Sequence, residues 1–435
     1  MLLFGQPFSS HIMKSMKRMD RNILAIDLKS FYASVECLDR NRDPFKTPLV
    51  VADEERGDGT IVLAASPFIK KEYKVQSRCR LYDVPKDIPN LIIAKPKRKR
   101  YLKVSADINK IYREYVSKED RLVYSIDESF LDVTDYLAIK NDTPESYARK
   151  IINEIKDKTG LTVTAGIGLN LFMAKAAMDI EAKHRPDCLA SWDYESVPEH
   201  LWSVTPLSKR WGIGSRMEKR LNKRGFYTIG DIAVSDPQYL AKELGVIGEE
   251  IYYHSHGYDD ALLKDTYVSN HHSLSVGQVL LRDYDASEMP TRIRDRAIEL
   301  SDRRYEEKVK ANTFVLFLGY KDHTGFGKKA SFFSPTDSAR KIGKELVRLF
   351  LDRPKEEREG TYRQISIVAE DVRSKEEEQL TLFEDYKEDE RIESLEKTLL
   401  HIRKRYGARK ARPCSARSLS STFLTRSNQI GGHHA

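Results

Sequence analysis

The sequence lacks a long hydrophobic run. None of its apolar stretches approaches the ~20 residues that a helix needs to cross a bilayer. In residues 1–21 the basic side chains follow the apolar ones, whereas a secretory signal peptide carries its positive charge first. We therefore expect a cytoplasmic protein with no membrane partner, in which residues 1–21 are an N-terminal extension.

Cysteine is scarce as well, and no two cysteines form a C-x-x-C pair. The four cysteines are Cys37, Cys79, Cys188 and Cys414. Residues so far apart support neither a zinc site nor a disulfide framework, so reduced thiols are expected.

Positive charge is in modest excess. Lys and Arg number 74 against 66 Asp and Glu, which gives a net charge of +8. A basic surface suits a polyanionic partner such as nucleic acid, although many basic proteins bind none, so charge alone leaves the partner open. A length of 435 residues is too great for one ordinary core and predicts several domains.

The first 190 residues have the pattern of an α+β domain, because short apolar runs alternate with longer amphipathic stretches. The expected elements are strands at 22–27, 48–52, 60–65 and 161–168 and a helix at 144–159. Residues 121–133 are typical of two strands joined by an acidic turn, since apolar residues flank Asp127 and Glu128 on both sides.

The later parts of the chain change in character. Residues 191–260 combine short helical segments with many glycines and no strand signals, which predicts a small helical domain. A linker at 261–272 precedes a second α+β unit at 273–372. Its expected elements are strands at 273–281, 312–320 and 364–372 and helices at 288–309 and 336–352. The acidic composition after 373 predicts a flexible tail over 373–435 with one helix at 390–406.

Three carboxylates stand at strand ends. Asp27 closes the apolar run NILAID, and Asp127 and Glu128 occupy the acidic turn. If the strands are neighbours, the three acids converge, and hard oxygen ligands of this kind suit Mg²⁺. Alternatively, Asp27 is a helix N-cap and the acidic pair is an ordinary hairpin turn; for either motif alone this interpretation is at least as good.

Two motifs separate these alternatives. DLKSFYASVE at 27–36, followed by SIDES at 125–129, resembles the two metal-binding motifs of the Y-family (translesion) DNA polymerases, in particular their bacterial damage-response branch. The resemblance extends over roughly 22–372 in the same domain order. It implies an α+β multidomain fold with four parts: a ferredoxin-like palm with fingers at 22–190, a helix-hairpin-helix thumb at 191–260, a little-finger DNA-binding domain at 273–372 and a tail.

The resemblance assigns roles within the motifs. It implies that Asp27, Asp127 and Glu128 are catalytic and bind two Mg²⁺ ions, assisted by the Leu28 carbonyl. Tyr32 stands at the steric-gate position, where its ring would exclude a 2′-hydroxyl. Phe31 would pack beside the incoming nucleotide. From the residues alone, Phe31 and Tyr32 could simply be core aromatics of an amphipathic helix, an alternative that suits Phe31 better than Tyr32.

Two further segments resemble the family's triphosphate contacts. LFMAKAAMDIEAKHRPD at 171–187 looks like the helix that supplies a lysine, here Lys175, and its apolar setting argues against full exposure. SPFIKKEYKV at 66–75 matches only in part. Where many relatives carry tyrosine and arginine, this chain has Phe68 and Lys71, and lysine lacks arginine's bidentate fork. Lys70 could share the task of binding the triphosphate.

DNA contacts are expected after the catalytic domain. Gly212-Ile213-Gly214 lies between two amphipathic helical stretches, a helix-hairpin-helix pattern in which glycine lets backbone amides approach a phosphate. Gly212, Gly214 and Arg216 are therefore the expected DNA-binding residues. A G-x-G is weak evidence alone and otherwise indicates a capped turn.

A peptide in the acidic tail predicts a protein partner. Exposed apolar residues on a flexible segment favour a recognition motif. The segment QLTLF resembles the pentapeptide by which bacterial polymerases bind the sliding clamp. Its expected clamp-binding residues are Gln379, Leu380, Leu382 and Phe383. The alternative is a short helix folded back on the protein.

These features together predict a monomeric, template-directed DNA polymerase of low fidelity that acts in DNA repair on primer-template DNA and deoxynucleoside triphosphates. Two alternatives belong to other classes. A non-catalytic regulator could bind DNA and the sliding clamp, although the three carboxylates argue against it. A nucleotide cyclase could use a similar palm, but it needs neither the hairpin nor the clamp peptide.

Overall fold

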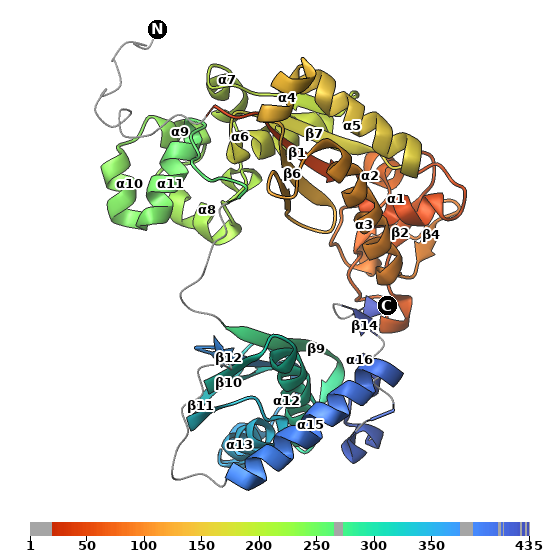
Figure 1. Cartoon of the computed structure of the whole chain (residues 1–435), viewed down its shortest axis with the longest axis vertical. Coiled ribbons are helices and arrows are strands. Elements are labelled where there is room, and N and C mark those ends of the chain that lie inside the picture. The colour runs from red at the N-terminus through yellow and green to blue at the C-terminus, as the bar shows by residue number, and fades with distance from the viewer. Residues whose placement is uncertain are drawn as a thin grey trace. The chain divides into compact units, whose positions relative to one another are not determined.

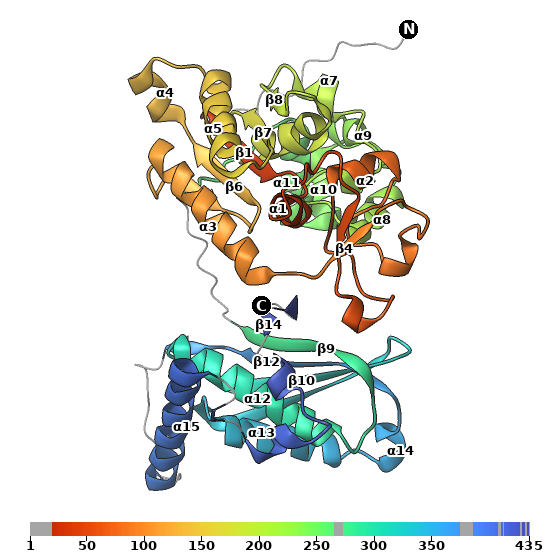
Figure 2. The same ribbon diagram turned by 90° about the vertical axis from the view of Figure 1, so that its right-hand side faces the viewer.

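The computed structural model describes residues 20–264, 273–374, 386–407, 410–411, 413–426, 429–430 and 433–434. The chain divides into two compact units, and the division falls between residues 266 and 267. Each unit contains its own sheets and helices (Figures 1 and 2). Each also has its own hydrophobic core. Among the described residues, no helix has both the length and the apolar character needed to cross a membrane.

The first unit is organised around a five-stranded sheet with the order β5-β6-β1-β7-β8. Its strands are β1 (Ile23–Leu28), β5 (Arg121–Val123), β6 (Glu128–Asp132), β7 (Val163–Gly168) and β8 (Leu189–Ser191). The central strand β1 pairs antiparallel with both β6 and β7. It is buried on both faces, which explains its nearly continuous apolar run.

Helices cover both faces of this sheet, and strand alternation decides which residue faces which helix. Leu24 and Ile26 pack in a core with α3 (Arg98–Tyr115) and α5 (Pro144–Thr159). Ile23 and Ala25 pack instead in a separate cluster with residues of α6. Helix α6 spans Leu171–Ala176, and α4 spans Thr134–Lys140.

A smaller sheet, with the order β3-β2-β4, lies beside α1 (Phe31–Leu38) and α2 (Pro67–Glu72). Its strands are β2 (Leu49–Val51), β3 (Ala64–Ala65) and β4 (Ile92–Ala94). The strand predicted at 60–65 is thus wrong in length. Only its last two residues pair with β2, whereas Ile61 makes an isolated bridge to Arg80.

Residues 192–264 contain helices and no strand. The helices are α7 (Val197–Leu201), α8 (Ser215–Asn222), α9 (Ile229–Ala233), α10 (Pro237–Leu244) and α11 (Val246–Ser255). They share one core, which also contains Phe172 and Met173 of α6. The hairpin at 212–214 differs from its prediction on one side, since only a three-residue 3₁₀ turn, Leu207–Lys209, precedes it.

The second unit is an antiparallel sheet with the order β11-β10-β12-β9 and helices packed on one face (Figure 2). The strands are β9 (Leu274–Tyr284), β10 (Val309–Tyr320), β11 (Gly325–Thr336) and β12 (Tyr362–Glu370). The helices are α12 (Met289–Glu306), α13 (Ala339–Leu351) and the short α14 (Lys355–Arg358), and β13 (Arg373–Ser374) pairs with β10. Strand β11 was not predicted.

The C-terminal segment packs on this second unit. Helix α15 (Tyr386–Tyr406) begins four residues before the predicted helix. Its Glu396 accepts hydrogen bonds from the backbone amides of Ala339 and Arg340 at the start of α13, and further on Thr422 donates a hydrogen bond to Gln278 of β9. The described part of the tail is therefore docked rather than a free tether. It ends in α16 (Phe423–Arg426), β14 (Gln429–Ile430) and β15 (His433–His434).

Candidate active site

Strand pairing brings the three acids to one edge of the central sheet. In the antiparallel pair of β1 and β6, Asp27 lies directly opposite Glu128, a position at which Cβ atoms are about 5 Å apart. The amide of Leu28 donates a 2.9 Å hydrogen bond to the carbonyl of Asp127, which places Asp127 beside the pair. The N-cap of α1 is Ser30, so Asp27 is not a helix cap.

Both facing carboxylates are largely buried. The side chain of Asp27 is 19% exposed and that of Glu128 is 10% exposed. Burial raises the pKa of Asp27, and the nearby charge of Asp127 adds to this effect. Burial likewise raises the pKa of Glu128. Buried acids gathered at one place are unfavourable unless cations compensate them.

Two lysines from the α6 segment provide this compensation. Asp27 and Glu128 share strand parity with Ala25 and Phe130, which pack against α6. Accordingly, Lys175 Nζ lies 2.6 Å from Glu128 Oε1, and Lys183 Nζ lies 2.9 Å from Asp27 Oδ2. Lys175 is only 5% exposed, as its apolar setting predicted.

The donor set fits divalent cations that bind together with a phosphate-bearing substrate. Asp127 differs from its neighbours because its carboxylate accepts a 2.7 Å hydrogen bond from the Ser125 hydroxyl and forms no ion pair with a described lysine. Within the described residues, no group of three His, Cys, Asp or Glu side chains is already gathered into a metal cage. Mg²⁺ usually uses one or two carboxylates with water and substrate phosphates, so a complete protein cage is not needed.

The two aromatic residues at the start of α1 have different surroundings. Phe31 is buried in the core of the first unit, which favours the interpretation of a core aromatic. Tyr32 is half-buried and stacks on Tyr101 of α3, with ring centroids 4.3 Å apart and planes at 15°. The Tyr101 hydroxyl donates a hydrogen bond to the buried carboxylate of Glu36. The gate candidate therefore has a fixed aromatic support that the sequence did not reveal.

The two adjacent lysines of α2 point in different directions. The Lys71 side chain is 83% exposed and lies 3.7 Å from the Glu72 carboxylate. Lys70 Nζ instead donates a 2.9 Å hydrogen bond to the Ser30 hydroxyl, next to β1. Burial lowers the pKa of Lys70, and the negative charge of Asp27 offsets part of that effect. Of the two, Lys70 is the one that faces the carboxylates.

The hairpin before α8 has the backbone geometry expected from its glycines. Gly212 has a φ of +89°, a conformation that residues with a Cβ rarely adopt. A Cβ there would also lie 3.2 Å from Arg210 Nη1. Ile213 is buried and anchors the loop, whereas Gly214 and Arg216 are exposed at the start of α8. Both glycines of the hairpin are therefore exposed to solvent.

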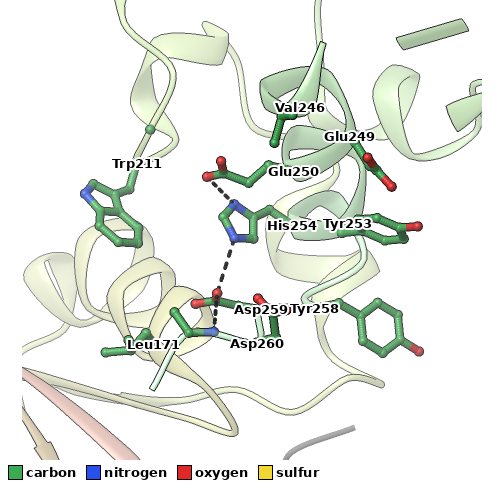
Figure 3. A pocket seen from close by; sticks show the side chains of 12 residues that line it. Leu171, Trp211, Val246, Glu249, Glu250, Tyr253, His254, Tyr258, Asp259 and Asp260 are labelled. Carbon is green, nitrogen blue, oxygen red and sulfur yellow. Dashed lines mark hydrogen bonds and ion pairs between the residues drawn. The ribbon is translucent and has the colours of Figure 1, made fainter. Parts of the chain in front are cut away.

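A pocket of about 620 Å³ lies where this hairpin, α6 and α11 meet. Figure 3 shows His254 between Glu250 and Asp259, with a ring nitrogen 3.8 Å from each carboxylate. Asp259 also accepts a 3.0 Å hydrogen bond from the amide of Phe172 in α6. The pocket is thus part of the joint between α6 and the helical segment, and the three strand-end carboxylates do not line it.

Residues 26–179 match the impB/mucB/samB family, and residues 271–382 match that family's C-terminal domain. Over 417 residues the chain is 35% identical to the "Putative UV-damage repair protein UvrX" of Bacillus subtilis (strain 168), which covers 95% of this chain and 97% of that protein. The chain therefore belongs to the impB/mucB/samB family, the Y-family DNA polymerases.

Within that family, the chain is also 28% identical to DNA polymerase IV 2 of the same organism, over 95% of this chain and 99% of the relative. Its fold is similar to that of the Y-family DNA polymerase chimera Dbh-Dpo4(243-245)-Dbh, with a TM-score of 0.64 at 20% identity. That match covers 81% of this chain and 99% of the chimera. The resemblance noted in the sequence and the α+β multidomain fold are both confirmed.

The sequence left three members of the site without a role: Lys183, Asp179 and Tyr101. The first two had a signal, because residues 175, 179 and 183 repeat at the i, i+4 spacing that brings helical side chains together. Tyr101 had none, since it comes from a distant helix. The clamp-peptide residues Gln379, Leu380, Leu382 and Phe383 lie outside the described residues.

Proposed function

We propose that this protein is a template-directed DNA polymerase of low fidelity that copies damaged DNA during repair. The reaction transfers a nucleotidyl group from a deoxynucleoside triphosphate to a primer 3′-hydroxyl and releases pyrophosphate. The observation that carries the proposal is the register that sets Asp27 opposite Glu128 with Lys175 and Lys183 against them. Primer extension by the purified protein with Mg²⁺, on intact and on damaged templates, tests it; no extension would favour the non-catalytic regulator.

Asp27, Asp127 and Glu128, with the Leu28 carbonyl, would hold two Mg²⁺ ions. Bound there, such ions stabilise the attacking and departing oxygens of a phosphoryl displacement. The protein's own groups orient the substrate. Lys175 and Lys183 are flexible ammonium groups suited to a triphosphate, and we assign Lys70 to the same task because it faces the carboxylates whereas Lys71 does not.

The nucleotide's sugar would rest on Tyr32. The ring of Tyr32 is held by its stack on Tyr101, and a rigid ring rejects an extra hydroxyl better than a mobile one does. Phe31 supports the same turn from the core.

Replacing Tyr32 by alanine should admit ribonucleotides, because it removes the ring on which exclusion of the 2′-hydroxyl depends. Steric exclusion of one group is worth roughly 2–3 kcal/mol, so we expect discrimination between deoxy- and ribonucleotides to fall by about 30- to 160-fold. The measurement is kcat/KM for both nucleotides in primer extension. Tyr32→Phe is the matched control and should keep discrimination; equal discrimination in Tyr32→Ala would remove the assigned role.

Two surfaces would hold primer-template DNA. The exposed glycines Gly212 and Gly214, with Arg216, suit a phosphate backbone. In the second unit, the sheet face opposite the helices is exposed and mixes small polar residues with the apolar side chains of Val279 and Phe317. By strand alternation this face includes Ser275, Gly277, Thr313 and Ser366. We accordingly assign 22–190 to palm and fingers, 191–260 to the thumb and 273–372 to the little finger.

The QLTLF peptide would bind the sliding clamp, and the polymerase would act as a monomer in the cytoplasm, where it meets DNA. Such attachment raises the local concentration of an enzyme whose own DNA contacts are small. Changing both Leu382 and Phe383 to alanine should abolish clamp capture in a pull-down, because it removes the two anchors. Primer extension without clamp should stay unchanged in that variant. Persistent capture would place the clamp contact elsewhere.

A further inference from the structure

The helical segment that carries both active-site lysines is irregular. After α6, the residues Ala177–Glu181 form a π turn and Ala182–His184 form a 3₁₀ turn. Single π turns inside helices occur frequently at functional sites. Asp179 lies in the middle of this π turn, and its side chain is one-quarter exposed at the site.

Asp179 contacts both lysines at once. Its Oδ2 lies 3.0 Å from Lys175 Nζ and its Oδ1 lies 2.7 Å from Lys183 Nζ. Each lysine holds a different strand carboxylate with the same ammonium group. The five groups thus form one alternating chain of charge, in the order Asp27, Lys183, Asp179, Lys175 and Glu128.

We propose that Asp179 is a positioning residue that keeps Lys175 and Lys183 in place when they leave the strand carboxylates for the triphosphate. The inference rests on the proposed polymerase function and extends it to a residue outside the proposed set of metal ligands. Asp179 is bound to the lysines and to no other described group. Its role is to fix where the two ammonium groups can reach.

The need for such a residue follows from the burial of the lysines. Lys175 is 5% exposed, and a buried ammonium without an anionic partner is strongly unfavourable. If the strand carboxylates are taken by other cations, each lysine loses one of its two partners. Asp179 then remains as the second partner of both, so the lysine stems stay ordered and only their ends must move.

The decisive variant is Asp179→Asn, which keeps the shape and removes the charge. If Asp179 acted only as a negative charge near the triphosphate, it would repel the triphosphate. Neutralising Asp179 would then tighten nucleotide binding. A positioning role predicts the opposite. Without Asp179 the lysines hold Asp27 and Glu128 more firmly and are less available, and we expect KM for the nucleotide to rise about tenfold with a smaller change in kcat.

The readout should include binding without turnover, measured as equilibrium nucleotide affinity on a dideoxy-terminated primer-template. Asp179→Glu should restore part of that affinity. Asp187→Asn, which removes a carboxylate paired with Arg185 and Arg149 instead, is the matched control and should bind as the wild type does. In a Lys183→Ala background the Asp179→Asn effect should shrink, because the two groups act together.

Unchanged or tighter nucleotide binding by Asp179→Asn would overturn the inference, as would full additivity with Lys183→Ala. Neither result would affect the proposed function, provided that the wild type extends primers. A wild type that neither extends primers nor binds nucleotide would instead reject the polymerase assignment itself.

Discussion

Replacing Asp127 and Glu128 together by alanine is expected to abolish detectable primer extension, with a loss of at least about 10³-fold in kcat/KM. Such a loss corresponds to about 4 kcal/mol of transition-state stabilisation, the scale on which bound metal ions act in phosphoryl transfer. The two residues are adjacent, and Glu128 lies opposite Asp27. Removing them leaves one of the three proposed carboxylate ligands.

The double variant also disturbs the lysines, so stability must be separated from chemistry. Glu128 is the partner of the buried Lys175. Removal of one member of a buried ion pair destabilises a protein by several kcal/mol. Here the loss of stability should be smaller, because Asp179 remains as a partner of Lys175. Asp127 has no such partner in the described part of the chain. Asp127→Ala alone should therefore keep the wild-type Tm while losing most of the activity.

A matched control is available close by. Glu119 is an exposed acid in the turn before β5, and Glu119→Ala should leave extension unchanged. Activity within tenfold of the wild type in the folded Asp127→Ala and Glu128→Ala double variant would contradict the assignment of these carboxylates. Such activity would mean that the metal ions are held by other residues.

The parts of the fold that the sequence predicted are those where one physical signal dominates. The apolar run ending at Asp27 predicted β1, because a strand buried on both faces needs continuous hydrophobicity. Helix α5 follows from a threonine cap, Pro144 at its first turn and Gly160 beyond its end. These signals are local, so the bounds were predicted closely.

One of the strands that were not predicted shows the converse. Strand β11 carries glycines, adjacent lysines and a proline, residues typical of turns and loops. It is an edge strand of its sheet, where lysine and proline discourage pairing with a further strand. Its existence depends on backbone pairing with β10 across a short turn, which hydrophobic periodicity does not report.

The convergence of the three acids was predictable from the sequence, whereas the lysines that pair with them were not predicted as their partners. The sequence placed three acids at strand ends, and convergence followed once β1 and β6 paired. Whether Lys70 or Lys71 faces those acids depends on the exact rotation of α2, which has only six residues. Successive residues on a helix differ by about 100° in direction, so a shift of one position reverses the answer.

Raising the salt concentration from roughly 50 to 200 mM should weaken primer-template binding by about 10³–10⁵-fold, given ~6–10 phosphate contacts. The expectation rests on where the cations lie. Around the hairpin at 212–214, Lys209, Arg216 and Lys219 are exposed. Each contact releases bound counterions from the DNA, so log Kd should change linearly with log salt. Fluorescence anisotropy of a labelled primer-template gives the slope.

The salt dependence of DNA binding should depend on where the cations lie and not on the net charge of the protein. Two variants that lose the same charge at different places test this expectation. Neutralising Arg216 and Lys219 to glutamine should reduce the slope by about 0.9 for each lost contact. Neutralising Lys150 and Lys158 on α5 removes the same charge, but these side chains pair with Asp142 and Glu154 and should leave the slope unchanged. Equal slopes in both variants would mean that the hairpin makes no phosphate contact, and a flat wild-type response would exclude an extended DNA-binding groove.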